Sequence, residues 1–144
     1  MEVYPITAVQ ARTLRSAVLR PGLPMEENVY PKDDDPGTFH AGLYDGEKLI
    51  GVASVFNESP SGEFPTSQWR LRGVCMLEPY RNRGLGEKLL DVCIAYVSEA
   101  DGTQIWCNAR EQARPLYERL GFTVEGERYD APVGGPHYRM RKIL

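Results

Sequence analysis

The chain has 144 residues, of which 42% are hydrophobic and 26% are charged, and its formal net charge is −3. These values predict one globular domain over residues 1–144, and the negative charge argues against a nucleic-acid partner. No apolar run reaches the roughly 18 residues that cross a bilayer, and the first residues lack a signal-peptide pattern, so no membrane partner is expected.

The first half of the chain predicts a strand, a helix and a hairpin. A strand over residues 2–7 precedes a helix that Thr7 is placed to cap and that ends before Pro21. Strands over residues 38–45 and 48–56 flank Asp45-Gly46, a hairpin turn signal. Between helix and hairpin lies an irregular acidic segment, interpreted either as a solvated loop or as the binding region for a cationic acceptor. Its acidic residues are Glu26, Glu27, Asp33, Asp34 and Asp35.

The second half predicts strands alternating with two helices. Strand 68–77 precedes a helix that starts after Gly84 and ends near residue 101, and strand 104–107 precedes a helix over residues 110–120. Strands 122–128 and 137–143 follow, separated by a turn over residues 132–136. We therefore expect a mixed α/β sheet, with the strands on either side of the first of these helices parallel. Gly73, inside strand 68–77, predicts a bulge or a close approach by another backbone or a ligand.

The turn Arg81-Asn82-Arg83-Gly84-Leu85-Gly86 is a candidate anion site, because free N–H groups and the helix dipole meet there. A P-loop is excluded since Glu87 follows Gly86, where that motif needs lysine. The dinucleotide fingerprint is disfavoured because Leu89 stands where a third glycine is required. An ordinary strand-to-helix turn is the remaining alternative.

Three blocks of sequence resemble the GNAT superfamily of acetyl-CoA-dependent N-acetyltransferases, and the resemblance covers nearly the whole chain. Residues 77–86 are similar to the family's Arg-x-x-Gly-x-Gly region, and residues 113–122 to its Ala-x-x-x-Tyr-x-x-x-Gly-Phe. Residues 107–110 with 135–137 resemble a bacterial subgroup. The resemblance implies a GNAT-like fold of about seven strands and three to four helices, with splayed central parallel strands.

The resemblance also implies acetyl-CoA as the cosubstrate and assigns roles. Backbone groups near the end of strand 68–77 would pair with pantetheine, with Gly73 helping to splay this strand from residues 104–107. The turn and helix start would hold the pyrophosphate, to which the side chain of Arg81 or Arg83 would add a contact unless both are solvated. The implied cofactor-binding residues are Cys75, Met76, Leu77, Asn82, Arg83, Gly84, Leu85, Gly86, Glu87, Lys88 and Asn108.

Tyr117 is the implied catalytic residue, because a phenol near the sulfur can protonate the thiolate after an amine attacks the thioester. The alternative is that Tyr117 only packs. A covalent acetyl-cysteine at Cys75 or Cys107 is disfavoured, since neither has a visible basic niche. The odd number of cysteines predicts a reducing, cytoplasmic location, and the two histidines lack a ligand cluster, so no metal site is expected.

Two positions depart from the family pattern. Ile105 stands where many members have a glutamate base, and Arg110 stands where many have an asparagine, so Asn108 is the substitute. The base is left open among Glu26, Glu27, His40, Glu78, His137 and a water. The implied function is acetyl transfer to a primary amine of a small molecule or peptide, by a monomer or homodimer. A non-catalytic CoA-binding module on the same fold and a nucleotide-binding enzyme of another type are the alternatives.

Overall fold

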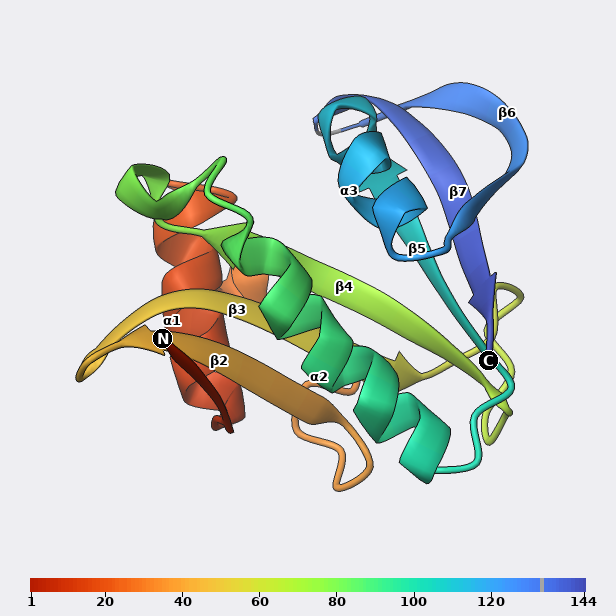
Figure 1. Cartoon of the computed structure of the whole chain (residues 1–144), viewed down its shortest axis with the longest axis horizontal. Coiled ribbons are helices and arrows are strands. Elements are labelled where there is room, and N and C mark those ends of the chain that lie inside the picture. Colours follow the sequence, from red (N-terminus) through yellow and green to blue (C-terminus); the bar gives the residue numbers. More distant parts are fainter. Residues whose placement is uncertain (133) are drawn as a thin grey trace. The chain divides into compact units, whose positions relative to one another are not determined.

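The structure is a computed structural model that describes residues 1–132 and 134–144 (Figure 1). Within these residues it has seven strands and three α-helices, as predicted. Three short 3-10 helices span Met25–Asn28, Glu78–Tyr80 and Glu111–Ala113. The main elements are β1 (Glu2–Pro5), α1 (Ala8–Val18), β2 (Phe39–Asp45), β3 (Lys48–Asn57), β4 (Gln68–Met76), α2 (Leu85–Glu99), β5 (Gln104–Arg110), α3 (Arg114–Arg119), β6 (Thr123–Ala131) and β7 (Gly135–Ile143).

The strands follow the order β1-β2-β3-β4-β5-β7-β6, and the chain divides into two compact units. The first unit comprises Met1–Phe56 and Leu71–Tyr96, and the second comprises Asn57–Arg70 and Val97–Leu144. The first three residues of β4 pair in parallel with the first three of β5, which confirms the predicted parallel pair. After this pairing β4 continues in the first unit and β5 in the second.

In the first unit, α1 and α2 cover opposite faces of the sheet (Figure 1). Leu14 of α1 packs with Val52 of β3, whereas Tyr96 of α2 stacks on Phe39 of β2, with ring centroids 4.3 Å apart. Coverage of both faces explains why β3 is buried continuously from Ile50 to Phe56 instead of alternating.

The predicted local signals of the first unit are confirmed. Thr7 caps α1 through a capping box, because its hydroxyl accepts from the Gln10 backbone while the Gln10 side chain accepts from the Thr7 backbone. The β2–β3 hairpin closes with Asp45 opposite Lys48 and with Gly46 at a φ of 59°.

In the second unit, β5, β7 and β6 pair antiparallel, and α3 covers one face of them. The Arg114 guanidinium of α3 lies 4.7 Å from the centre of the Tyr138 ring, so Tyr138 marks the covered face. Side chains alternate along a strand, and Asn108 is paired with Arg139. The side chains of Trp106, Asn108 and Arg139 therefore share the face opposite α3.

The predicted helix over residues 110–120 is wrong at its start. β5 continues to Arg110, a 3-10 turn follows, and α3 begins only at Arg114. Pro115 explains the break, because proline lacks an N–H and is tolerated in the first turn of a helix but not in its interior. The predicted turn over residues 132–136 includes Val133, which lies outside the described residues, and β7 begins at Gly135 within that range.

Candidate active site

The turn before α2 presents an open helix N-terminus. Gly84 has a φ of 74°, and a side chain added there would meet nothing within 4 Å. α2 begins at Leu85, so Gly86 to Lys88 lie in its first turn, where backbone N–H groups have no helical acceptor. Backbone N–H groups in the first turn of a helix can bind an anion, and this role of the turn stays a prediction.

Side chains around this turn hold it in place within the first unit. The Tyr80 hydroxyl donates to Asp45 Oδ2 at 2.8 Å, and this hydrogen bond raises the pKa of Tyr80. Arg81 Nε donates to the Met76 carbonyl at 2.9 Å, which turns Arg81 back toward β4. Arg83 is exposed, with its guanidinium 5.4 Å from the Tyr80 ring centre. Lys88 Nζ donates to the Met1 carbonyl.

Some of the backbone groups predicted to pair with pantetheine already have partners. The Leu77 N–H donates to the Ile50 carbonyl at 2.8 Å, and the Met76 carbonyl accepts from Arg81. Cys75 is 7% exposed. The end of β4 is thus engaged on one side by β3 and at one carbonyl by Arg81, which the sequence pattern did not show.

Tyr117 lies in α3 of the second unit and is buried. Its ring packs edge-on against Phe122, with ring centroids 5.4 Å apart and planes at 65°. The backbone binds the same pair, because the Phe122 N–H donates to the Tyr117 carbonyl at 3.0 Å. These contacts orient the phenol; its predicted catalytic role stays a prediction.

Asn108 is joined to a residue that sequence reasoning missed. Its Oδ1 accepts from Arg139 Nε at 2.8 Å, and the Arg139 guanidinium stacks 4.8 Å from the Trp106 ring centre. Only the register of β5 with β7 brings these residues together, and no spacing in the sequence signals it. The predicted contact of Asn108 with the cofactor stays a prediction, with Oδ1 already occupied by Arg139.

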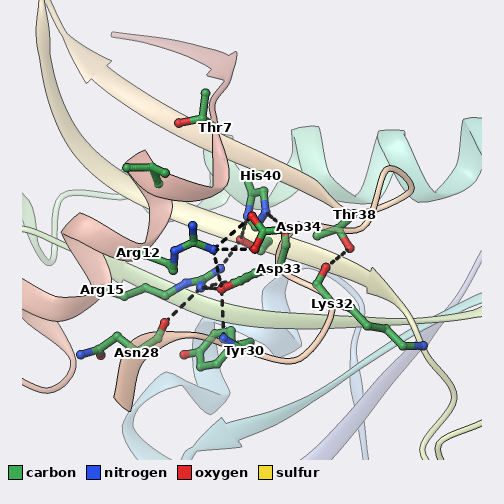
Figure 2. Close-up of polar contacts among 12 residues, drawn as sticks. Thr7, Arg12, Arg15, Asn28, Tyr30, Lys32, Asp33, Asp34, Thr38 and His40 are labelled. Carbon is green, nitrogen blue, oxygen red and sulfur yellow. Dashed lines mark hydrogen bonds and ion pairs between the residues drawn. The ribbon is translucent and has the colours of Figure 1, made fainter. Parts of the chain in front are cut away.

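A buried polar cluster occupies the first unit, as Figure 2 shows. Arg15 is fully buried, and its Nη1 donates to both Asp33 oxygens at 3.0 and 2.9 Å. Its Nη2 donates to Ser54 Oγ at 2.8 Å. His40 Nδ1 lies 2.6 Å from Ser54 Oγ, and His40 Nε2 lies 2.9 Å from the Asp33 carbonyl.

These contacts give His40 a structural role. Since Nε2 faces a carbonyl it carries the proton, and Nδ1 accepts from the Ser54 hydroxyl. Burial lowers the pKa of His40, and Arg15 lowers it further. His40 is therefore neutral and buried, and both of its ring nitrogens already have hydrogen-bond partners. This arrangement argues against His40 as the general base, for which it was a candidate.

The other candidate bases differ in setting. Glu26 and Glu78 are exposed, and the side chain of Glu27 lies outside the described part of the chain. His137 is buried, and its Nδ1 lies 2.8 Å from the Gly135 carbonyl. Ile105, at the position of the family glutamate, is fully buried.

The acidic segment is less available to a cation than its sequence indicated. The Asp33 carboxylate is 1% exposed and pairs with Arg15, and Asp34 pairs with Arg12 at 3.3 Å. The interpretation of the segment as a cation-binding loop is wrong for Asp33. Two arginines of α1 form ion pairs with these aspartates, and these pairings cannot be seen from the sequence alone.

The buried thiols do not support a covalent route. Burial raises the pKa of Cys93 to about 12, and it raises the pKa of Cys107 to about 12 despite the opposing charges of Arg139 and Arg70. Thiols of this kind are protonated at neutral pH and are poor nucleophiles.

No helix in the described part of the chain is long and apolar enough to cross a membrane.

Known proteins of similar structure share this fold. The chain aligns with an aminoglycoside 6'-N-acetyltransferase complexed with coenzyme A at a TM-score of 0.73 and 15% identity, covering 99% of this chain and 97% of that one. It aligns with the IAA acetyltransferase from Bacillus cereus ATCC 14579 at a TM-score of 0.76 and 14% identity, covering 99% of each chain. At these identities the likeness shows the fold.

The sequence comparisons show the family. The model of the acetyltransferase (GNAT) family matches residues 8–122. YitI of Bacillus subtilis (strain 168), named as an uncharacterized N-acetyltransferase, is 33% identical over 144 residues, covering 100% of this chain and 97% of YitI. The chain therefore belongs to the GNAT family and is an N-acetyltransferase whose cosubstrate is acetyl-CoA.

Proposed function

We propose that the enzyme transfers acetyl from acetyl-CoA to a primary amine of a small molecule or peptide by direct attack. The amine nitrogen bonds to the thioester carbon, the carbon–sulfur bond breaks, and the amine loses a proton to a base or to water. Tyr117 donates a proton to the departing thiolate. The observation that carries this role is the buried phenol in the family motif, oriented by Phe122.

The proposed cofactor contacts follow the open helix N-terminus. Backbone N–H groups from Asn82 or Arg83 to Lys88 would hold the pyrophosphate, supported by the unobstructed backbone at Gly84. The exposed Arg83 is better placed to contact a phosphate than Arg81, which is bonded to Met76. Backbone groups of Cys75 to Leu77 that do not face β3 would pair with pantetheine, and Asn108 would contribute from β5.

Direct attack is preferred to an acetyl-cysteine intermediate at Cys107, because burial raises the pKa of that thiol to about 12. The three cysteines are buried and none forms a disulfide, which supports a reducing, cytoplasmic compartment as part of the proposal.

Tyr117→Phe tests the proposal, since it removes the proton and keeps the ring that packs on Phe122. Once a panel of amines has identified an acceptor, thiol release is measured with that acceptor saturating and acetyl-CoA varied. The kcat should fall about 100-fold, with little change in KM for acetyl-CoA. Tyr4→Phe is the matched control, because Tyr4 is exposed in the first unit and should leave kcat unchanged. Full activity in Tyr117→Phe would remove the proton-donor role.

A second candidate, a non-catalytic CoA-binding module, is favoured by one observation: buried Ile105 occupies the position of the family base. Calorimetric binding of acetyl-CoA without thiol release from any amine would support the module over the transferase.

A further inference from the structure

The face of the second unit opposite α3 carries a half-buried guanidinium that forms no ion pair within the described part of the chain. Arg141, two residues along β7, pairs with Glu125 at 3.3 Å, and Arg70 lies 3.9 Å from Glu58. Arg139 is half-buried and lies opposite Glu125 in the register of β6 with β7, but the Glu125 carboxylate pairs with Arg141. Among the described residues, Arg139 has no ion pair of its own. A charge held in such a place attracts an anion more strongly than a solvated one does.

The orientation of Arg139 is set before any ligand arrives. Its Nε is bonded to Asn108 Oδ1 at 2.8 Å, and its plane is held against Trp106. Trp106 is itself fixed, because its Nε1 donates to the Glu58 carbonyl at 2.8 Å and the Arg70 guanidinium flanks its ring at 5.0 Å. A guanidinium ordered in this way loses little further conformational freedom on binding.

The donors that remain fit a carboxylate. With Nε on Asn108, the two Nη groups of Arg139 have no hydrogen-bond partner among the residues that the structure describes. A planar guanidinium and a carboxylate match each other through paired N–H···O bonds.

We propose that Arg139, oriented by Asn108, forms a subsite for a carboxylate of the acceptor, so that the acceptor is an amine that also carries a carboxylate, such as an amino acid. This inference rests on the proposed transfer to an amine. It differs from the interpretation of a cationic acceptor, for which the Asp33 carboxylate is not available because Arg15 pairs with it.

The test compares amino acids with their amides, which keep the amine and lose the negative charge, under saturating acetyl-CoA. The wild-type protein should favour the acids by about tenfold or more in kcat/KM, the effect expected of a charge-assisted hydrogen bond. Arg139→Gln should abolish this preference through KM, and Arg139→Lys should retain part of it. Arg128→Gln is the matched control: it removes a guanidinium of the neighbouring strand β6, where Arg128 pairs with Glu111 at 3.2 Å, and it should keep the preference.

A binding measurement separates failure of the subsite from failure of the transferase. Calorimetry of the CoA-saturated protein with N-acetylglycine and N-acetylglycinamide should show tighter binding of the acid, lost in Arg139→Gln and kept in Arg128→Gln. Acetyl transfer that ignores the carboxylate, equal binding of the two compounds, or an unchanged preference in Arg139→Gln overturns the subsite while leaving acetyl transfer intact. Absence of thiol release with any amine contradicts the proposed transfer, and the calorimetry still decides the subsite.

Discussion

Arg15 is a charged side chain buried completely, and its neighbours offset the cost of removing that charge from water. Asp33 accepts two of its hydrogen bonds and Ser54 a third. Its Nε is buried without a hydrogen-bond partner in the described residues and lies against Gly73, where an added Cβ would stand 2.7 Å from it. The guanidinium also lies 4.2 Å from the Tyr30 ring centre. The atoms that crowd Gly73 therefore belong to the side chains of Arg15 and Tyr30, and not to another backbone or a ligand as the sequence predicted.

Gly73→Ala should destabilise the protein by about 2 kcal/mol or more, because a φ of 71° strains alanine and Arg15 and Tyr30 leave it no room. Urea unfolding measures the loss. Gly22→Ala is the control, since Gly22 has a φ of 84° with nothing within 4 Å and should show the backbone strain alone. Equal losses in the two variants would mean that the contact with Arg15 costs nothing.

His40 predicts a pH dependence of stability. Burial lowers the pKa of folded His40 below its ordinary value of about 6.5, so the unfolded chain takes up this proton first as the pH falls. The contribution of neutral His40 to the free energy of unfolding is complete above about pH 6.5. It is lost as the pH falls from this value through the lower pKa of the folded state. In urea unfolding between pH 5 and 7.5, the free energy of unfolding should decrease as the pH falls, and this dependence on pH should be weaker in His40→Asn. The same slope in both proteins would exclude His40 as its source.

At the scale of elements, local chemistry explains where helices begin. α1 starts where Thr7 and Gln10 exchange hydrogen bonds, and α3 starts where Pro115 falls in a first turn. The shortness of α3 leaves its stability to packing, because so short a helix does not form alone. Tyr117 and Phe122, bonded through backbone and packed through their rings, supply part of that packing.

Thr7→Ala should cost about 1 kcal/mol in urea unfolding, because it removes the oxygen that accepts from the Gln10 N–H. Thr13→Ala is the control within the same helix. The Thr13 hydroxyl bonds the Val9 carbonyl, and alanine's higher helix propensity compensates for its removal, so the change should stay within about 0.5 kcal/mol. A Thr7→Ala protein as stable as wild type would show that the cap adds nothing.

At the scale of the whole molecule, the three cysteines report on the folded state of both units. All three are buried, with Cys75 and Cys93 in the first unit and Cys107 in the second. Reagents that attack a solvent-exposed thiolate should therefore react slowly with these cysteines while the protein stays folded.

Native protein should therefore resist iodoacetamide at pH 8, whereas denatured protein should gain three adducts by mass spectrometry. A pKa of about 12 leaves roughly one thiolate in ten thousand at Cys93 and Cys107 at that pH. The denatured sample is the control for reagent and access. Rapid modification of Cys107 in active protein would contradict its burial.

The amino-acid sequence alone predicts the order of elements, the hairpin at Asp45, the cap at Thr7, the glycine turn before α2 and the family. Each of these rests on residues close together in the chain, where periodicity, cap chemistry and turn chemistry act. The start of α3 also has a local signal in Pro115, which the helical pattern of residues 110–120 outweighed in the prediction.

The pairing of charged residues follows from the three-dimensional fold and could not be predicted from the sequence. Arg15 meets Asp33 across 18 positions of the chain, and Asn108 meets Arg139 across 31. Such pairs depend on strand register and on which helix face is buried, and neither is written in the spacing of the residues. The Asp33 carboxylate of the acidic segment is therefore unavailable to a cation, because Arg15 of α1 pairs with it. Arg139 of β7, which is half-buried, is the side chain that we propose binds an anion.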